Sequence, residues 1–390
     1  MKEIYLDNNA TTKVDEAVFE EMRPYLCELY GNPSSMHFFG GQVQKKVDEA
    51  RNRVAALLGA LPEEIIFTAC GTESDNTAIR SALEAFPEKR HVITTRVEHP
   101  AVLTLCRNLT KKGHRVTELG VDGAGRLNLD DLKKAVDDDT AIVSVMWANN
   151  ETGVVFPIEE IGAIVKERGA LFHSDAVQAV GKIPLNMAAS TLDMLSLSGH
   201  KLHAPKGIGI LYLRKGTPFR PFMVGGHQER SRRAGTENTA AIIALGKACQ
   251  VAGEWMEDEN TRVLAMRDRL ERELLKIIPH ARINGGGAER LPNTLSIAFE
   301  FVEGEAILLL LSEKGICASS GSACTSGSLE PSHVLRAMGV PFTCAHGSIR
   351  FSLSRFTTDE EIDTVIRELP PIIRRLREIS PFGRELLKNS

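Results

Sequence analysis

The sequence predicts an α/β protein with a large domain built on a mainly parallel sheet and a smaller α+β domain. Three observations lead to this prediction. Between residues 61 and 213, short apolar segments alternate with amphipathic ones, as in a parallel sheet covered by helices on both faces. Near residue 292 the pattern changes to strands and helices without regular alternation. The chain of 390 residues is long for one domain and comfortable for two.

The composition excludes several classes of protein. Hydrophobic residues make up 43% of the chain and charged residues 25%, which is ordinary for a soluble globular protein. The net charge of -4 offers no basic surface for nucleic acid, and the longest apolar runs, such as 306–311, are too short to span a membrane. The N-terminal residues contain no apolar signal segment. Seven cysteines without an export signal indicate reduced thiols, so we expect a cytoplasmic protein.

The N-terminal part begins with a short predicted strand at residues 3–12 that runs into the polar turn 8–12. Apolar residues then recur at helical spacing from Val43 to Leu58, and this helix is predicted to end at Gly59. The alternating part follows. Its strands are predicted at 64–69, 91–95, 115–119, 141–147, 171–174, 192–197 and 208–213, with helices at 72–85, 101–112, 130–136 and 158–168.

The C-terminal part begins with a helical stretch at 238–271 that bridges to the second domain. Its later elements are a strand at 294–301, helices at 304–314 and 332–338, a strand at 348–352 and a helix at 358–369. Pro370 and Pro371 are predicted to interrupt the final helical segment, because proline lacks the N–H that a helix interior needs.

Polar segments follow five of the predicted strands. In open α/β sheets, ligands bind beyond the carboxyl ends of the strands. A single His or Asp at such a place is usually structural, but five polar strand ends at one edge indicate a binding site. The turn before the helix at 72 suits a phosphate, although a simple Thr72 N-cap explains it equally well. The five segments are 70–74, 98–100, 149–153, 175–178 and 198–201.

Lys201 lies at the end of the apolar run 192–197, among Ser, Gly and His residues. A lysine that is partly desolvated at a strand end has a lowered pKa and becomes an amine nucleophile, as a Schiff base requires. Taken alone, a lysine in a glycine-containing turn is more often a solvated surface charge. The neighbouring polar strand ends favour the nucleophile.

Cys324 stands in the segment 318–328, which consists almost wholly of small residues. Such a segment cannot contribute to a core, so we expect an exposed loop and a reactive thiol. The other cysteines considered lie on apolar segments and are interpreted as small hydrophobic residues: Cys27, Cys106, Cys249, Cys317 and Cys344. No Cys-x-x-Cys pair supports a zinc ribbon or a ferredoxin-type cluster.

Together these motifs resemble the pyridoxal 5'-phosphate (PLP)-dependent cysteine desulfurases of the NifS/IscS family, in the class V aminotransferase superfamily. The most specific motifs are Ser198-Gly199-His200-Lys201 and Ser320-Gly321-Ser322-Ala323-Cys324, and the resemblance runs from the segment 7–12 to the helix near 369. The segments 149–153 and 233–238 are most similar to the nitrogen-fixation NifS type.

The resemblance implies a fold and a division into domains. The fold would be fold-type I, with a mainly parallel seven-stranded sheet in the large domain. The large PLP-binding domain would span residues 15–255. Residues 1–14 with 256–390 would form the small domain, which carries the catalytic cysteine loop at about 318–330.

The resemblance also implies roles for individual residues. Lys201 would form the Schiff base with PLP, and Asp175 would pair with the pyridine nitrogen. His99 would stack on the ring and take part in proton transfer. The other implied contacts are Gln178 and Asn150 at the ring hydroxyl; Gly71, Thr72, Ser198 and His200 at the phosphate; Thr236 at the phosphate of the other subunit of a homodimer; and Arg350, Asn150 and Asn8 at the substrate.

The implied activity is conversion of L-cysteine to L-alanine by a sulfurtransferase, with the sulfur held as a persulfide on Cys324. An iron–sulfur scaffold protein would accept the sulfur, nitrogenase cluster maturation being one destination. Cys324 could also be a transient ligand of the nascent cluster, shared with the scaffold. Neither nucleic acid nor membrane is expected as a partner.

Three alternatives remain open at this stage. A selenocysteine lyase or another class V aminotransferase-type PLP enzyme would keep Lys201 and Asp175, but would have no need of an exposed Cys324. A catalytically idle docking platform for sulfur carriers is disfavoured by the complete set of cofactor positions. A dinucleotide site at 285–287 is disfavoured because no strand-turn-helix frames these glycines.

Overall fold

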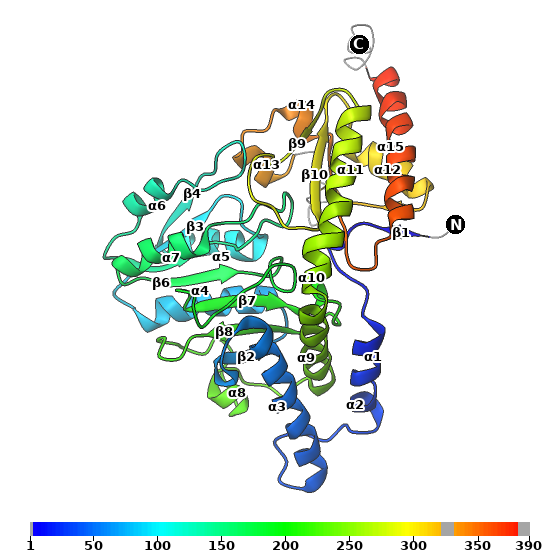
Figure 1. Cartoon of the computed structure of the whole chain (residues 1–390). Helices are drawn as coiled ribbons and strands as arrows, with labels where there is room; N and C mark the ends of the chain where they lie inside the picture. Colours follow the sequence, from blue (N-terminus) through cyan, green and yellow to red (C-terminus); the bar gives the residue numbers. More distant parts are fainter. Residues whose placement is uncertain (1–2, 321–330, 381–390) are drawn as a thin grey trace.

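The chain forms one large sheet and one smaller sheet, each with its own hydrophobic core (Figure 1). In this computed structural model, residues 3–320 and 331–380 are described. The large sheet has seven strands in the order β2-β8-β7-β6-β5-β3-β4. Strand β8 runs opposite to the other six strands, so the predicted mainly parallel seven-stranded sheet is confirmed. Its strands are β2 (Ile65–Thr68), β3 (His91–Thr95), β4 (Arg115–Leu119), β5 (Thr140–Ser144), β6 (Leu171–Asp175), β7 (Met194–Ser198) and β8 (Gly209–Leu213).

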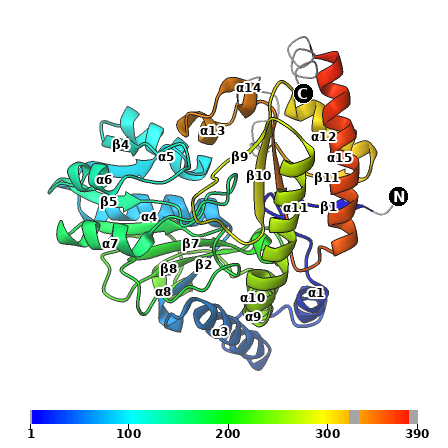
Figure 2. The same ribbon diagram turned by 45° about the horizontal axis from the view of Figure 1, so that its top comes forward.

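Helices cover both faces of this sheet, because the central strands are apolar on both sides. Neighbouring residues such as Ile142 and Val143 on β5 belong to different hydrophobic clusters on opposite faces. One face packs on α4 (Gly71–Ala85) and α5 (Pro100–Lys111). The other packs on α3 (Phe38–Leu58), α6 (Leu129–Ala135), α7 (Ile158–Glu167) and α9 (Thr239–Glu254). Figure 2 shows α3 and α9 beneath the sheet.

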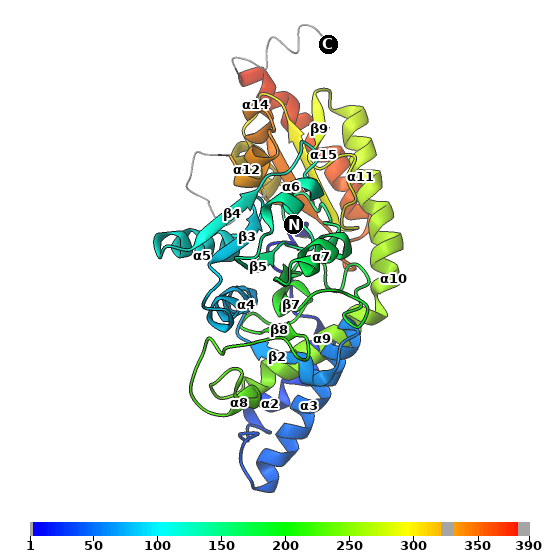
Figure 3. The same cartoon turned by 90° about the vertical axis from the view of Figure 1, so that its left-hand side faces the viewer.

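The smaller sheet is antiparallel, in the order β12-β10-β9, and Figure 3 shows it with its helices above the large sheet. Strand β1 pairs with β11, and Asp7 bridges to Ser352, so the N-terminal segment joins this part of the molecule. Its elements are β1 (Ile4–Tyr5), α11 (Leu264–Ile277), β9 (Ala281–Ile283), β10 (Thr294–Phe299), α12 (Gly304–Glu313), β11 (Ile316–Cys317), α13 (His333–Ala337), α14 (Phe342–Ala345), β12 (Ser348–Ser352) and α15 (Asp359–Ile379).

Short helices complete the fold: α1 (Glu16–Met22), α2 (Pro24–Cys27), α8 (Gln228–Ser231) and α10 (Met256–Asp258). A π-helical turn, Glu259–Val263, joins α10 to α11. The helical stretch from α9 to α11 therefore crosses residue 255, where the large domain was predicted to end. The domain boundaries stay a prediction.

Most predicted elements agree with the structure to within a few residues, but the interruption at Pro370 and Pro371 is wrong. Helix α15 continues through both prolines to Ile379. Proline removes a helical hydrogen bond, yet Leu369, Ile372 and Ile373 around the two prolines are buried in the core of the small sheet. This packing holds the helix together. Within residues 3–320 and 331–380, no helix is long and apolar enough to cross a membrane.

Helix α9 packs closely against α3, and substitution of two glycines of α9 tests this packing. A Cβ on Gly246 would lie 2.5 Å from Cα of Ala50, whereas a Cβ on Gly253 of the same helix would meet only Cδ1 of Leu57 at 3.7 Å. We expect Gly246→Ala to destabilise the protein by about 1–3 kcal/mol, because backbone cannot yield as a side chain does. The matched Gly253→Ala should leave stability unchanged or raise it by up to about 1 kcal/mol. Equal melting temperatures of the two variants would contradict this packing.

Candidate active site

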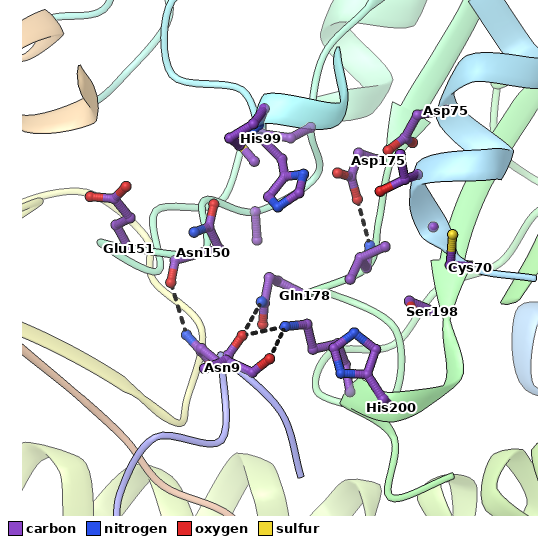
Figure 4. Close-up of a pocket in the computed structure, with 18 of the residues that line it drawn as sticks. Asn9, Cys70, Asp75, His99, Asn150, Glu151, Asp175, Gln178, Ser198 and His200 are labelled. Atoms are coloured by element: carbon purple, nitrogen blue, oxygen red, sulfur yellow. Dashed lines mark hydrogen bonds between the residues drawn. The ribbon is translucent and has the colours of Figure 1, made fainter. Parts of the chain in front are cut away.

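A cavity of about 310 Å³ lies at the carboxyl ends of the central strands (Figure 4). This volume is in the range of small-molecule sites. All five polar strand ends predicted from the sequence contribute to it, together with the N-terminal segment and β12. The predicted site residues that line it are Gly71, Thr72, His99, Asn150, Asp175, Gln178, Ser198, His200, Lys201 and Arg350.

Lys201 ends the short 3-10 turn Gly199–Lys201 that follows β7. Its Nζ donates hydrogen bonds to the backbone oxygens of Asn9, at 2.6 Å, and Ala10, at 2.7 Å. Burial is the largest cause that lowers the pKa of Lys201, to about 7, and the positive charge of Arg350 lowers it further. A substantial fraction of the amine is therefore neutral near pH 7 and can act as a nucleophile or a base.

Asp175 ends β6 and points into the cavity (Figure 4). Its Oδ1 accepts the N–H of Val177 at 3.0 Å. Burial raises the pKa of Asp175, while His99, the N–H of Val177 and Lys201 all act to lower it. A buried carboxylate with these partners is suited to pair with a cationic group of a ligand.

The N-terminus of α4 forms another wall of the cavity. Cys70 precedes the helix, and its side chain caps no backbone N–H. Free N–H groups and the helix dipole at such a terminus attract anions. A Cβ on Gly71 would lie 2.9 Å from Cγ2 of Val177, so the helix approaches the strand ends closely here. Ser198 and His200 face this region from β7 and the turn after it (Figure 4).

His99 and His200 are both held with lowered pKa values. His99 caps α5 by accepting the N–H of Ala101 at its Nδ1, at 3.2 Å. Burial is the largest cause that lowers its pKa. Burial likewise lowers the pKa of His200 to about 4, and its Nδ1 lies 3.1 Å from the hydroxyl of Thr11. Both rings are therefore neutral near pH 7.

Arg350 crosses from β12 to the cavity and is buried. It donates to the backbone oxygen of Asn150 at 2.9 Å and pairs with Asp7 at 2.7 Å. Gln178 donates to the backbone oxygen of Asn9 at 3.0 Å, and its own Oε1 is buried with no hydrogen-bond partner in the described part of the chain. A bound molecule could supply that partner.

Three of the predicted site residues are not placed in the cavity. Asn8 is buried, but its amide donates to the backbone oxygens of Ser352 and Tyr5, and it lines a second, smaller cavity. Thr236 is exposed and does not line the cavity of this single chain. Cys324 lies outside the described residues. Their roles stay predictions.

The geometry of this cavity can be compared with known proteins. The family model described as aminotransferase class-V matches residues 4–365. The chain belongs to this family. It is 63% identical over 385 residues to a protein of Trichormus azollae named cysteine desulfurase, covering 99% of this chain and 96% of the relative. It is 61% identical over 383 residues to the protein of Azotobacter vinelandii named cysteine desulfurase NifS, covering 98% of this chain and 95% of the relative.

Solved structures agree with this assignment. A structure described as a NifS-like protein matches with a TM-score of 0.90 and 41% identity, covering 96% of this chain and 100% of its own. Another, described as SspA in complex with cysteine, matches with a TM-score of 0.80 and 33% identity, covering 92% of this chain and 100% of its own.

Three ionisable residues in the cavity wall were not predicted as site residues from the sequence. Asp75 lies on α4 four residues after Gly71, so both are on the same helix face; that spacing could have found it. Glu151 follows Asn150 and is buried against the hydroxyl of Ser332. His333 lies far along the chain, and its Nε2 is 2.9 Å from the backbone oxygen of Glu98. Nothing in the local sequence indicates that contact.

The pKa of Lys201 can be tested by amine labelling across a pH series in the ligand-free protein. With a pKa of about 7, labelling of the Lys201 peptide should reach half its maximum near pH 7. In urea-unfolded protein the midpoint should return to about 10.4, the value for a solvated lysine. Lys201→Arg identifies the peptide. An identical midpoint in the folded and unfolded protein would contradict the desolvated amine.

Proposed function

We propose that the protein is a PLP-dependent cysteine desulfurase that converts L-cysteine to L-alanine and transfers the sulfur to an acceptor. The observation that carries this proposal is the desolvated amine of Lys201 in one cavity with the buried carboxyl of Asp175. The relatives named cysteine desulfurase support the choice of substrate.

The cavity fits the phosphate of PLP at the N-terminus of α4. The uncapped helix end offers backbone N–H groups to an anion, and the hydroxyl of Thr72 adds a donor. The close approach of Gly71 to Val177 leaves no room there for a Cβ. Ser198 and His200 would complete the phosphate site. Thr236 would reach the phosphate of a second subunit. It is exposed, as is Val224, twelve residues earlier, at 81%, which suits packing of this region against another copy.

The cavity also fits the ring. Asp175 would pair with the protonated pyridine nitrogen, since its anionic form has attractive partners on the cavity side. The ring of His99 would stack on the cofactor. The partnerless Oε1 of Gln178 marks an amide that can rearrange toward a ligand, so Gln178 and Asn150 would hold the ring hydroxyl.

When bound, PLP supplies an electron sink for the electron pair left on the substrate carbon. The neutral amine of Lys201 can accept the proton that leaves the substrate Cα, because its pKa of about 7 matches that task. The guanidinium of Arg350 would hold the substrate carboxylate by paired hydrogen bonds, with Asn150 beside it. Asn8 would support this end of the substrate through its hold on Ser352.

Cys324 would receive the sulfur; this role rests on the sequence. Its thiolate would attack the substrate sulfur, so that a sulfur–sulfur bond forms and the carbon–sulfur bond breaks. The electron pair of the broken bond stays with the carbon, which gains a proton and leaves as alanine. The persulfide on Cys324 would then pass to an iron–sulfur scaffold protein, with Cys324 as a transient ligand of the nascent cluster. We propose that the protein acts in the cytoplasm as a homodimer.

The substrate and the cofactor can be tested in one experiment with the PLP-loaded protein. We expect a visible absorption band that changes on addition of L-cysteine, with alanine formed in the same sample. In Lys201→Ala the band should lose the Schiff-base signature and alanine formation should fall by at least about a thousandfold, since both the covalent link and the base are lost. A protein that binds PLP but ignores L-cysteine would point to another class V PLP enzyme, such as a selenocysteine lyase.

The thiol is tested separately. Cys324→Ala should keep the visible spectrum of the bound cofactor but release no sulfide from L-cysteine in the presence of a thiol reductant, because no persulfide can form. Cys27→Ala, which removes an exposed cysteine elsewhere, is the matched control and should retain activity. Full sulfide release by Cys324→Ala would refute the persulfide on this residue.

A further inference from the structure

Asp75 is an acid in the cavity wall that the proposed chemistry does not use. It lies on α4 and is only 1% exposed, while Asp175 is 5% exposed. Figure 4 shows the side chains of Asp75 and Asp175 next to each other. Two buried carboxyl groups at close range cannot both remain ionised, since each charge opposes the other. One of the two must hold a proton.

Asp75 lacks a cation that would stabilise its anionic form. Its Oδ1 is buried and has no hydrogen-bond partner within the described residues. The nearest ring nitrogen is Nε2 of His173, at 3.7 Å. Both ring nitrogens of His173 lie 2.9 Å from serine hydroxyls, those of Ser144 and Ser196. Burial lowers the pKa of His173 to about 3, so this imidazole is neutral and brings no positive charge to Asp75.

The other groups that face Asp75 do not stabilise its anionic form either. Glu98, from the segment after β3, is fully buried, and burial raises its pKa to about 8. Burial first, and then the negative charge of Asp175, raise the pKa of Asp75 well above its usual range. The hydroxyl of Ser196 acts in the opposite direction. Among the described residues, the groups that influence the pKa of Asp75 are Asp175, Ser196 and Glu98, and none of them carries a positive charge.

Asp175 has the partners that Asp75 lacks. Its Oδ1 accepts the N–H of Val177, and the amine of Lys201 favours its anionic form. The negative charge of the pair therefore belongs on Asp175 and the proton on Asp75.

We propose that Asp75 is a positioning residue: its neutral carboxyl holds a proton and donates it in a hydrogen bond toward the carboxylate of Asp175. Such a donor keeps Asp175 charged and oriented in a buried site without adding a second negative charge. The location of the proton on Asp75 does not depend on a bound cofactor. The effect of Asp75 on cofactor binding rests on the proposed function.

The first test is infrared spectroscopy of the ligand-free protein at neutral pH. A neutral buried carboxyl gives a C=O band distinct from carboxylate bands and sensitive to deuterium exchange. We expect the difference spectrum between wild type and Asp75→Asn to show loss of one such band. Thr77→Val, which removes a buried hydroxyl of the same helix that donates to the backbone oxygen of Glu73, should show no such loss. Asp175→Asn should retain the band, because the proton stays on Asp75. Loss of the band in Asp175→Asn, or loss of carboxylate absorption instead in Asp75→Asn, would overturn the assignment.

The second test measures PLP dissociation constants by visible absorption. The amide of Asp75→Asn can still donate a hydrogen bond toward Asp175, so its affinity should stay within about threefold of wild type. Asp75→Leu offers no donor and should weaken binding by at least about tenfold. Equal weakening in both variants, or none in either, would overturn the role of Asp75.

The two tests separate the failure of this inference from that of the proposed function. If wild-type protein fails to bind PLP, the proposed function is wrong, but the infrared result still decides where the proton lies. If Asp75→Leu does not fold, the isosteric Asp75→Asn decides the question through the same infrared comparison.

Discussion

The site depends on one constraint: an amine must be kept out of water without losing its reactivity. The place of Lys201 in the fold satisfies this constraint. The strand before it is fully buried, and the turn after β7 directs the side chain to the backbone oxygens of Asn9 and Ala10. These carbonyls accept hydrogen bonds but carry no full charge, so they hold the amine in place without stabilising its cationic form as a carboxylate would. The N-terminal segment that provides them must therefore be fixed. The pairing of β1 with β11 and the contact of Asp7 with Arg350 anchor the chain just before these two residues.

The cavity must also accommodate several acidic side chains without an excess of buried negative charge. Acids surround the cavity in larger number than the proposed chemistry needs, and burial raises the pKa of Asp75, Glu98 and Glu151. Neutral acids donate hydrogen bonds without adding charge, so the walls of the cavity can be polar while water is excluded from it. Asp175, whose anionic form Lys201 and the N–H of Val177 favour, is then the natural place for the negative charge of its pair with Asp75.

The sequence predicted most of this site because its signals are local. Apolar runs with polar ends placed the strands, and the topology of a parallel sheet brought those ends together. The features that the sequence did not predict depend on contacts between residues far apart in the chain. The two carbonyls that hold Lys201 have no side-chain signature at all. His333 reaches the cavity only through the fold of the C-terminal part. The helix through Pro370 forms because tertiary packing outweighs local preference, which no pattern of residues near the prolines reveals.

Arg350 connects substrate binding to the state of Lys201. Its positive charge is, after burial, the largest influence that lowers the pKa of Lys201. On the proposed function, a substrate carboxylate would pair with Arg350 and offset that charge. The amine would then hold a proton more readily at the stage when it must take one from the substrate Cα. Before substrate arrives, the charge of Arg350 favours the neutral, nucleophilic amine of Lys201. The same arginine thus suits Lys201 to two successive tasks, and Asp7, its partner in the ligand-free protein, keeps it in place for both.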